Sequence, residues 1–165
     1  MQANQQLHFL QEKIKEIRSA IFFNLSDSVL KLPSTIVATL QVDDYGYVWF
    51  FVKKPRQHVT EFEAEFPVRL DYFKKGIDCF LQVSGKAWVV HDPEDIVAFT
   101  MLTGNAGEVS STDRVLVKVK MLKAEYYETQ SGAQNSWWQN VVGNFVNWFG
   151  YGNSVSPNTY FPLSS

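Results

Sequence analysis

Residues 36–52 read IVATLQVDDYGYVWFFV, which is the pattern of a β-hairpin. Every second residue of its first half is apolar, and we expect these side chains to point into the core: Ile36, Ala38, Leu40 and Val42. The acidic residues and the glycine of 43–46 favour a tight reversal. The run 47–52 is almost wholly aromatic or β-branched and predicts a buried strand.

Further strands and helices flank this hairpin. Alternating or β-prone runs predict the other strands at residues 20–25, 68–72, 78–90 and 115–121. Helical spacing, capping residues or first-turn prolines predict helices at residues 4–18, 55–65, 93–104 and 137–149. Gly85 falls inside the longest strand and indicates a bulge or bend. Six short strands joined mostly by hairpins indicate an α+β fold whose antiparallel sheet closes into a small barrel with flanking helices.

The chain is long enough for one sizeable core, because it has 165 residues of which 45% are hydrophobic. We expect a single domain overall, with a barrel over residues 1–128 and a linker, aromatic helix and tail over 129–165. This C-terminal helix has one apolar side, but its polar residues include no lysine or arginine that anionic lipid would attract. Packing on the barrel or on a dimer partner is therefore favoured over a membrane surface.

Charge, cysteine content and missing motifs exclude several classes of function. A formal net charge of −2 provides no basic field for nucleic acid, and the histidines and Cys79 form no metal-ligand pattern. No apolar run reaches the roughly 20 residues of a membrane span. We therefore expect no metal, no nucleic acid, no membrane and a cytoplasmic location, where an unpaired thiol is usual. Nucleophile and dinucleotide-binding motifs are missing, so no catalytic residue can be named and a cofactor would carry any chemistry.

The order of these segments resembles one known family. The segments YVWFFV (47–52), VRLDYF (68–73) and LQVSGKA (81–87) follow one another as in the general stress protein branch of the pyridoxamine 5'-phosphate oxidase-like family. The likeness covers about residues 5–127 and includes the shorter landmarks WFF, VSG and DPE. It implies a six-stranded antiparallel FMN-binding split barrel that forms a homodimer, with FMN at each of two sites between the subunits.

The resemblance also implies a phosphate site after the strand 47–52. Family members usually continue there with small hydroxyl residues and a later lysine or arginine, whereas this chain continues with charged residues. The side chains of Lys53, Arg56 and His58, together with the N–H groups of a helix beginning at Pro55, would supply the anion contacts. The alternative is that these cations are solvated and discourage pairing at a strand edge.

A second departure from the family lies before the hairpin. The family often has an Arg-Pro pair near the flavin ring, whereas residues 31–35 read KLPST. The proline matches and the arginine does not. We expect the backbone of Pro33, Ser34 and Thr35 to approach the edge of the ring.

The remaining candidates come from the strands. The residues Phe50, Phe51 and Val52 would shape a planar pocket, although aromatic residues of a central strand are more often part of the core. Gln82 would donate and accept hydrogen bonds to a heterocycle through its side-chain amide, or would face solvent together with Ser84.

These observations predict an FMN-binding, general stress protein-like flavoprotein, with flavin-dependent oxidoreductase activity as the implied chemistry. The alternative is a non-enzymatic split-barrel binding module that has lost tight flavin binding and holds another small planar or phosphate-bearing ligand. True pyridoxamine 5'-phosphate oxidase activity is disfavoured, because the substrate-binding C-terminal motif of that enzyme has no counterpart in residues 137–165.

Overall fold

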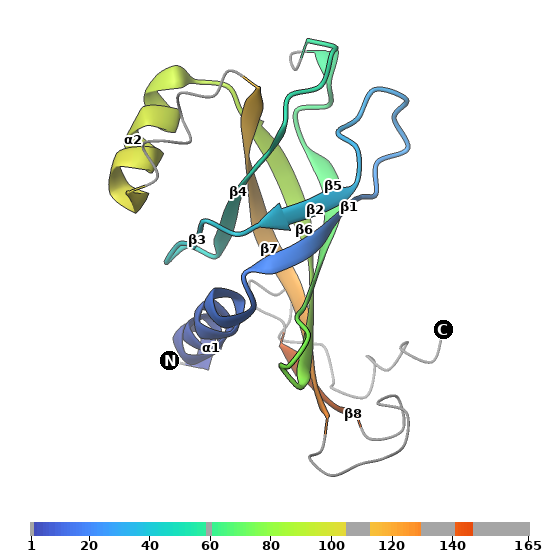
Figure 1. Cartoon of the computed structure of the whole chain (residues 1–165), viewed down its shortest axis with the longest axis vertical. Helices are drawn as coiled ribbons and strands as arrows, with labels where there is room; N and C mark the ends of the chain where they lie inside the picture. Colours follow the sequence, from blue (N-terminus) through green and yellow to red (C-terminus); the bar gives the residue numbers. More distant parts are fainter. Residues whose placement is uncertain (1, 59–60, 105–112, 130–140, 147–165) are drawn as a thin grey trace.

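The computed structural model describes residues 2–58, 61–104, 113–129 and 141–146. Its elements in chain order are α1 (Gln2–Ile17), β1 (Ser19–Asn24), β2 (Thr35–Ala38), β3 (Gln41–Val42), β4 (Tyr47–Lys53), β5 (Phe66–Phe73), β6 (Cys79–Val90), α2 (Pro93–Thr103), β7 (Arg114–Thr129) and β8 (Val141–Val146). The strands pair antiparallel in the order β2-β1-β5-β6-β7-β4-β3, with β8 also on β7. The sheet curls into an open barrel (Figure 1), so the predicted α+β split barrel is confirmed.

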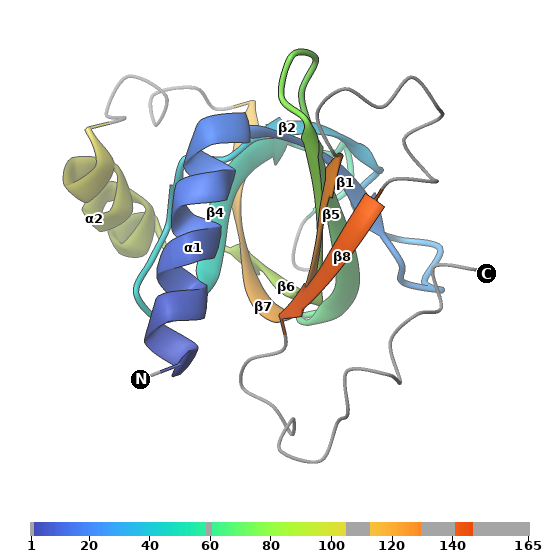
Figure 2. The ribbon, with the colours of Figure 1, turned by 90° about the horizontal axis from the view of Figure 1, so that it is seen from below.

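The core fills the inside of this curled sheet. Alternate residues of the long strands point inward and are fully buried, as Leu70, Leu81 and Val117 illustrate. Helix α1 lies along one side of the barrel opening (Figure 2) and contributes Leu10 and Ile14 to the same core. The helical spacing of apolar residues near the N-terminus thus predicted a packed helix correctly.

One turn, one helix cap and one bulge also agree with the sequence. Gly46 closes the reversal after β3 with a φ of 84°, a conformation in which glycine is favoured. Asp92 caps α2, since its side chain accepts a hydrogen bond from the N–H of Glu94 at 2.9 Å. The β6–β7 register shifts between Ser84 and Gly85, so the predicted bulge is confirmed.

The predicted strand over residues 36–43 needs a correction. It is broken at Thr39 and Leu40 into β2 and β3, and its first half faces the other way. The side chain of Ile36 is 75% exposed, whereas that of Val37 is 3% exposed. The reason is the register with β1, in which Val37 lies opposite Ala20, a core residue. The expectation of an inward face is therefore wrong for Ile36 and Ala38.

The predicted helix over residues 55–65 is also wrong. The described residues between β4 and β5 form bends and turns, and the N–H of Glu61 donates to the carbonyl of His58 at 3.0 Å. A segment of this length is marginal as an isolated helix, and the sheet takes Phe66 as the first residue of β5. The described backbone after Pro55, residues 56–58 and 61–65, therefore offers no helix N-terminus to an anion.

The C-terminal aromatic helix is wrong over Val141–Val146, which form β8. This segment contains β-branched residues and a central glycine, which favour a strand over a helix. Strand β7 extends beyond its pairing with β4, and β8 pairs with the remaining stretch from Ala124 to Thr129. The other residues of the predicted helix, including Trp137 and Trp148, lie outside the described residues.

Candidate functional site

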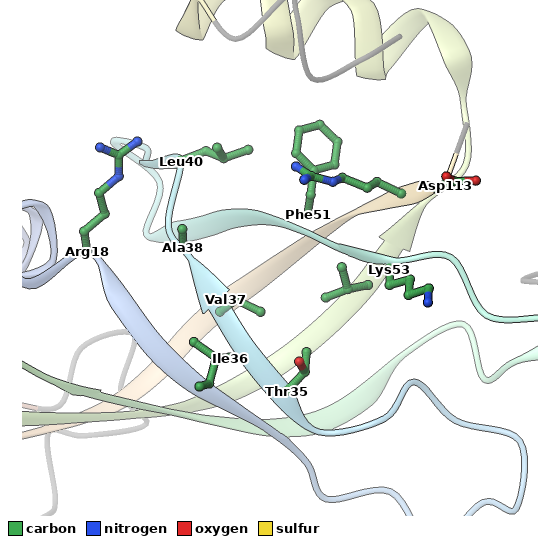
Figure 3. Close-up of a pocket in the computed structure, with 11 residues that line it drawn as sticks. Arg18, Thr35, Ile36, Val37, Ala38, Leu40, Phe51, Lys53 and Asp113 are labelled. Carbon is green, nitrogen blue, oxygen red and sulfur yellow. The ribbon is translucent and has the colours of Figure 1, made fainter. Parts of the chain in front are cut away.

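An open groove lies where the barrel is split, between β2 and the end of β4 (Figure 3). Its volume is about 680 Å³, within the usual range for small-molecule sites. We call it the split groove, and its lining residues are Arg18, Thr35, Ile36, Val37, Ala38, Leu40, Phe51, Val52, Lys53, Asp113 and Arg114.

The groove exists because β3 covers only the beginning of β4. The N–H of Leu40 donates to the carbonyl of Trp49 at 2.8 Å, and β3 pairs with Trp49 and Val48. Among the described strands, none pairs with β4 beyond this point on the same edge, and none pairs with the outer edge of β2. Two strand edges therefore face each other across the split.

Backbone polar groups line both walls. Because the carbonyl of Trp49 points to the split edge and backbone direction alternates along a strand, the N–H and C=O groups of Phe51 and Lys53 point there too. On the opposite wall, the N–H of Thr39 donates to the carbonyl of Arg18 on the β1 side. The same alternation leaves the backbone groups of Ile36 and Ala38 directed into the split. The groove thus presents both donors and acceptors to a ligand.

Cationic side chains lie at the two ends of the groove. Lys53 and Arg114 are directly opposite each other in the β4–β7 register, and Lys53 is exposed. Asp113 lies at the same end, where its carbonyl accepts a hydrogen bond from the N–H of Lys54 at 2.6 Å. Arg18 lies at the other end of the groove, and Phe51 lies between Arg18 and Asp113 (Figure 3). Such a groove suits an elongated ligand with an anionic group.

The wall between these ends is apolar. Ile36, Leu40 and Phe51 contribute partly or largely exposed side chains, whereas Val37 and Val52 are buried beneath them. Apolar walls with few polar groups are typical of sites that hold planar rings.

A buried hydrogen bond supports the β2 wall from inside the barrel. The hydroxyl groups of Tyr72 and Thr39 lie 2.7 Å apart, and both residues are buried. Burial raises the pKa of Tyr72 well above its ordinary value, and the bond to Thr39 offsets only part of this effect. Tyr72 therefore stays neutral over the physiological pH range and keeps Thr39 in place.

The structure brings four of the sequence-predicted site residues into the groove. Thr35, Phe51, Val52 and Lys53 all line it. Phe50 alternates to the opposite side of β4, where its ring lies 5.3 Å from that of Phe22 in the core. Neighbouring aromatic residues of one strand thus have different environments.

The other predicted residues lie elsewhere. Arg56 and His58 are exposed on the bends after β4 and do not line the groove. Pro33 is exposed before β2, and the hydroxyl of Ser34 accepts a hydrogen bond from the N–H of Asn24 at 3.1 Å. Gln82 lies on the outer face of the barrel.

The Gln82 amide has a partner within the protein. Its Nε2 donates to Oδ1 of Asp71 at 3.1 Å, and Arg69 Nε donates to the same oxygen at 3.1 Å. Asp71 is 9% exposed, so these two bonds satisfy a largely buried carboxylate. This arrangement favours a structural role for Gln82.

Sequence reasoning missed Arg18, Asp113 and Arg114. Arg18 follows the last residue of α1, Asp113 precedes β7 and Arg114 begins it, so nothing in the sequence pattern connects them. Their proximity depends on the pairing of β1 with β2 and of β4 with β7.

The described residues contain no group of three histidine, cysteine or carboxylate side chains that could hold a metal ion. In the same part of the chain, no helix is long and apolar enough to cross a membrane.

Solved structures share this fold. A general stress protein 26 of Jannaschia sp. CCS1 is 15% identical, with a TM-score of 0.58, and the match covers 87% of this chain and 99% of that one. A protein of Clostridium acetobutylicum, related to general stress protein 26 and described as pyridoxinephosphate oxidase family, has 10% identity, coverages of 88% and 96% and a TM-score of 0.57. The general stress FMN/FAD binding protein of Xanthomonas citri has 20% identity, coverages of 79% and 93% and a TM-score of 0.55.

The sequence itself matches a family model. No curated protein matches the chain significantly. The model described as pyridoxamine 5'-phosphate oxidase like matches residues 5–146, which include every described strand and most of α1. The chain therefore belongs to the pyridoxamine 5'-phosphate oxidase-like family.

Proposed function

We propose that this protein binds FMN in the split groove, with the flavin phosphate at the Lys53 end. The observation that carries this proposal is that two cationic residues, Lys53 and Arg114, lie opposite each other in the β4–β7 register at one end of a groove with mostly apolar side chains. The hydroxyl of Thr35 lies at this end as well (Figure 3). Two cations and a hydroxyl are suitable donors for a phosphate, and Asp113 offsets part of their charge.

The rest of the groove fits a flavin ring. Ile36, Leu40 and Phe51 provide apolar contact area, and the unpaired edges of β2 and β4 provide donors and acceptors for the polar rim of the ring. Family membership supports the same ligand, as does the name of the Xanthomonas citri neighbour, an FMN/FAD binding protein. When bound, FMN would supply the redox chemistry of a flavin-dependent oxidoreductase, while the residues of the groove hold its phosphate and ring.

We also propose that the protein acts as a cytoplasmic homodimer. The groove is open on one side, and Ile36 at its wall is 75% exposed. A second subunit covering this side would bury Ile36 and exclude water from the ligand. The resemblance to the family, in which flavin lies between subunits, supports this arrangement.

The absorption spectrum of the purified protein is the first test. We expect flavin bands in the protein as purified, or quenching of FMN fluorescence and a rise in Tm when FMN is added. The double variant K53Q/R114Q should weaken FMN binding, whereas K74Q/K75Q, which changes two exposed lysines in a distant turn, should not. Light scattering should give the mass of a dimer. Protein that is colourless and unaffected by FMN would contradict the proposal.

The absence of arginine from β2 favours a second candidate, a non-enzymatic binding module. The residues of β2 that line the groove are Thr35, Ile36, Val37 and Ala38, and only the first has a polar side chain. A module of this kind would hold another planar or phosphate-bearing ligand. A stoichiometric, reducible flavin in the purified protein would contradict this candidate.

A further inference from the structure

Arg18 connects α1 to β1 in a backbone conformation that arginine rarely adopts. Its φ is 69°, and among the described residues only glycines otherwise have a positive φ. Its N–H donates to the carbonyl of Ile14 at 2.6 Å, which gives α1 a left-handed C-terminal cap. Glycine is the usual residue at this position. The connection therefore requires a left-handed backbone but does not itself require arginine.

The side chain of Arg18 has no local contact that explains it. It is exposed, and no hydrogen bond or ion pair joins its guanidinium to another residue within the described ranges. It lines the split groove beside Leu40 (Figure 3). A strained residue without a structural contact, directed at a groove, indicates a function for its side chain.

Arg18 and Lys53 lie at opposite ends of the groove, so they would contact opposite ends of a bound ligand. Strand β2 runs along the groove from Thr35 to Ala38, and Ala38 pairs with Ser19, the residue after Arg18. Three residue steps of a strand span about 10 Å. A ligand whose phosphate lies beside Lys53 therefore extends its opposite end toward Arg18. A guanidinium there can donate two parallel hydrogen bonds.

We propose that Arg18 is a specificity-determining residue of the split groove, whose guanidinium donates hydrogen bonds to acceptor atoms at the ring end of a bound flavin. This inference rests on the proposed function. It accounts for an arginine at a position that favours glycine, and it gives the groove a cationic side chain that β2 does not supply.

The test combines two variants with two ligands. Glycine and asparagine both tolerate a left-handed backbone, so R18G and R18N remove the guanidinium without adding strain. We expect the Kd for FMN and the Kd for riboflavin to rise equally, by about tenfold or more, because both ligands carry the ring. Without ligand, the Tm of R18G should rise by about 2 °C as the backbone strain is relieved.

The matched control is K15Q, which changes an exposed cation in the last turn of α1 that does not line the groove. It should alter neither Kd. If wild-type protein binds FMN and both Arg18 variants bind it equally well, the role of Arg18 is overturned and the proposed function stands. A lower Tm for R18G would indicate that the arginine is kept for folding, which also overturns the inference. If wild-type protein binds neither flavin, the proposed function fails and this inference fails with it.

Discussion

The hydroxyl groups of Tyr72 and Thr39 lie 2.7 Å apart inside the barrel and join β5 to the connection between β2 and β3. The N–H of Thr39 in turn donates to the carbonyl of Arg18 at 2.9 Å. One wall of the split groove is thus anchored to the centre of the core.

Replacing Tyr72 with phenylalanine should reduce the loss of stability at high pH. Burial raises the pKa of Tyr72 in the folded protein, so the unfolded chain releases this proton first as the pH rises. The contribution of Tyr72 is complete below about pH 10 and is lost above it, at about 1.4 kcal/mol per pH unit. Urea unfolding at a series of pH values should give a shallower decline for Y72F than for wild type.

The matched control is Y45F, because Tyr45 is 76% exposed. It should follow the wild-type decline. Equal slopes for Y72F and wild type would contradict the assignment. Near neutral pH, Y72F should lose about 1 kcal/mol, because Thr39 loses its hydrogen-bond partner.

Adding a methyl group at Gly85 should destabilise the protein strongly. A Cβ there would overlap the backbone carbonyl of Lys120 on β7, which cannot move without disturbing the sheet. We expect G85A to lower the free energy of unfolding by at least about 2 kcal/mol. G76A serves as the comparison, since its Cβ would meet open space and only its φ of 90° is unfavourable, at about 1 kcal/mol. Equal losses in the two variants would contradict this account.

Removing the carboxylate of Asp43 should weaken the reversal before β4. Its Oδ1 accepts hydrogen bonds from the N–H groups of Tyr45 and Tyr47, both at 2.9 Å, and its Oδ2 accepts from Trp49 Nε1 at 2.9 Å. We expect D43A to lose about 2 kcal/mol in urea unfolding. From the described residues, the neighbouring Asp44 carboxylate accepts one exposed hydrogen bond, from Gln11 at 3.3 Å, so D44A should change stability by less than about 0.5 kcal/mol. Similar effects of D43A and D44A would count against this role.

Neutralising Lys53 should affect a phosphorylated flavin selectively. We expect K53Q to raise the Kd for FMN about tenfold, through loss of a charge-assisted contact, and to leave the Kd for riboflavin unchanged. Fluorescence titrations of both ligands measure this difference, and K74Q at a distant turn is the control. A loss of affinity for both ligands would place Lys53 at the ring instead.

The sequence predicted where most strands lie, but it did not predict which face of each strand is buried. Alternating or β-prone runs located the segments of β4, β5 and β6, and the glycine at position 85 indicated a bulge. Alternation alone could not orient β2, because Ile36 and Val37 are equally apolar and only the pairing with β1 selects the inward side chain. The helical spacing of apolar and aromatic residues also misassigned Val141–Val146, which pair with the edge of β7 and form a strand.

Four residues of the groove were predictable from the sequence, Thr35 through the resemblance before the hairpin and three more through one strand. Phe51, Val52 and Lys53 follow one another at the end of β4, so one motif captured all three. Arg18 and Arg114 join them only through pairings that span long stretches of chain. Such contacts depend on the register of non-local strands, which a single sequence does not reveal.

The place of β7 in the sheet also determines how the barrel can fold. Strand β7 lies between β6 and β4, and Tyr47 pairs with Lys120, a partner 73 positions later in the chain. During synthesis, β4 cannot pair with β7 until β7 has left the ribosome. The aromatic residues of β4 therefore stay exposed to solvent while most of the chain is made. The entropy of closing so long a loop predicts slow folding, on the scale of milliseconds to seconds.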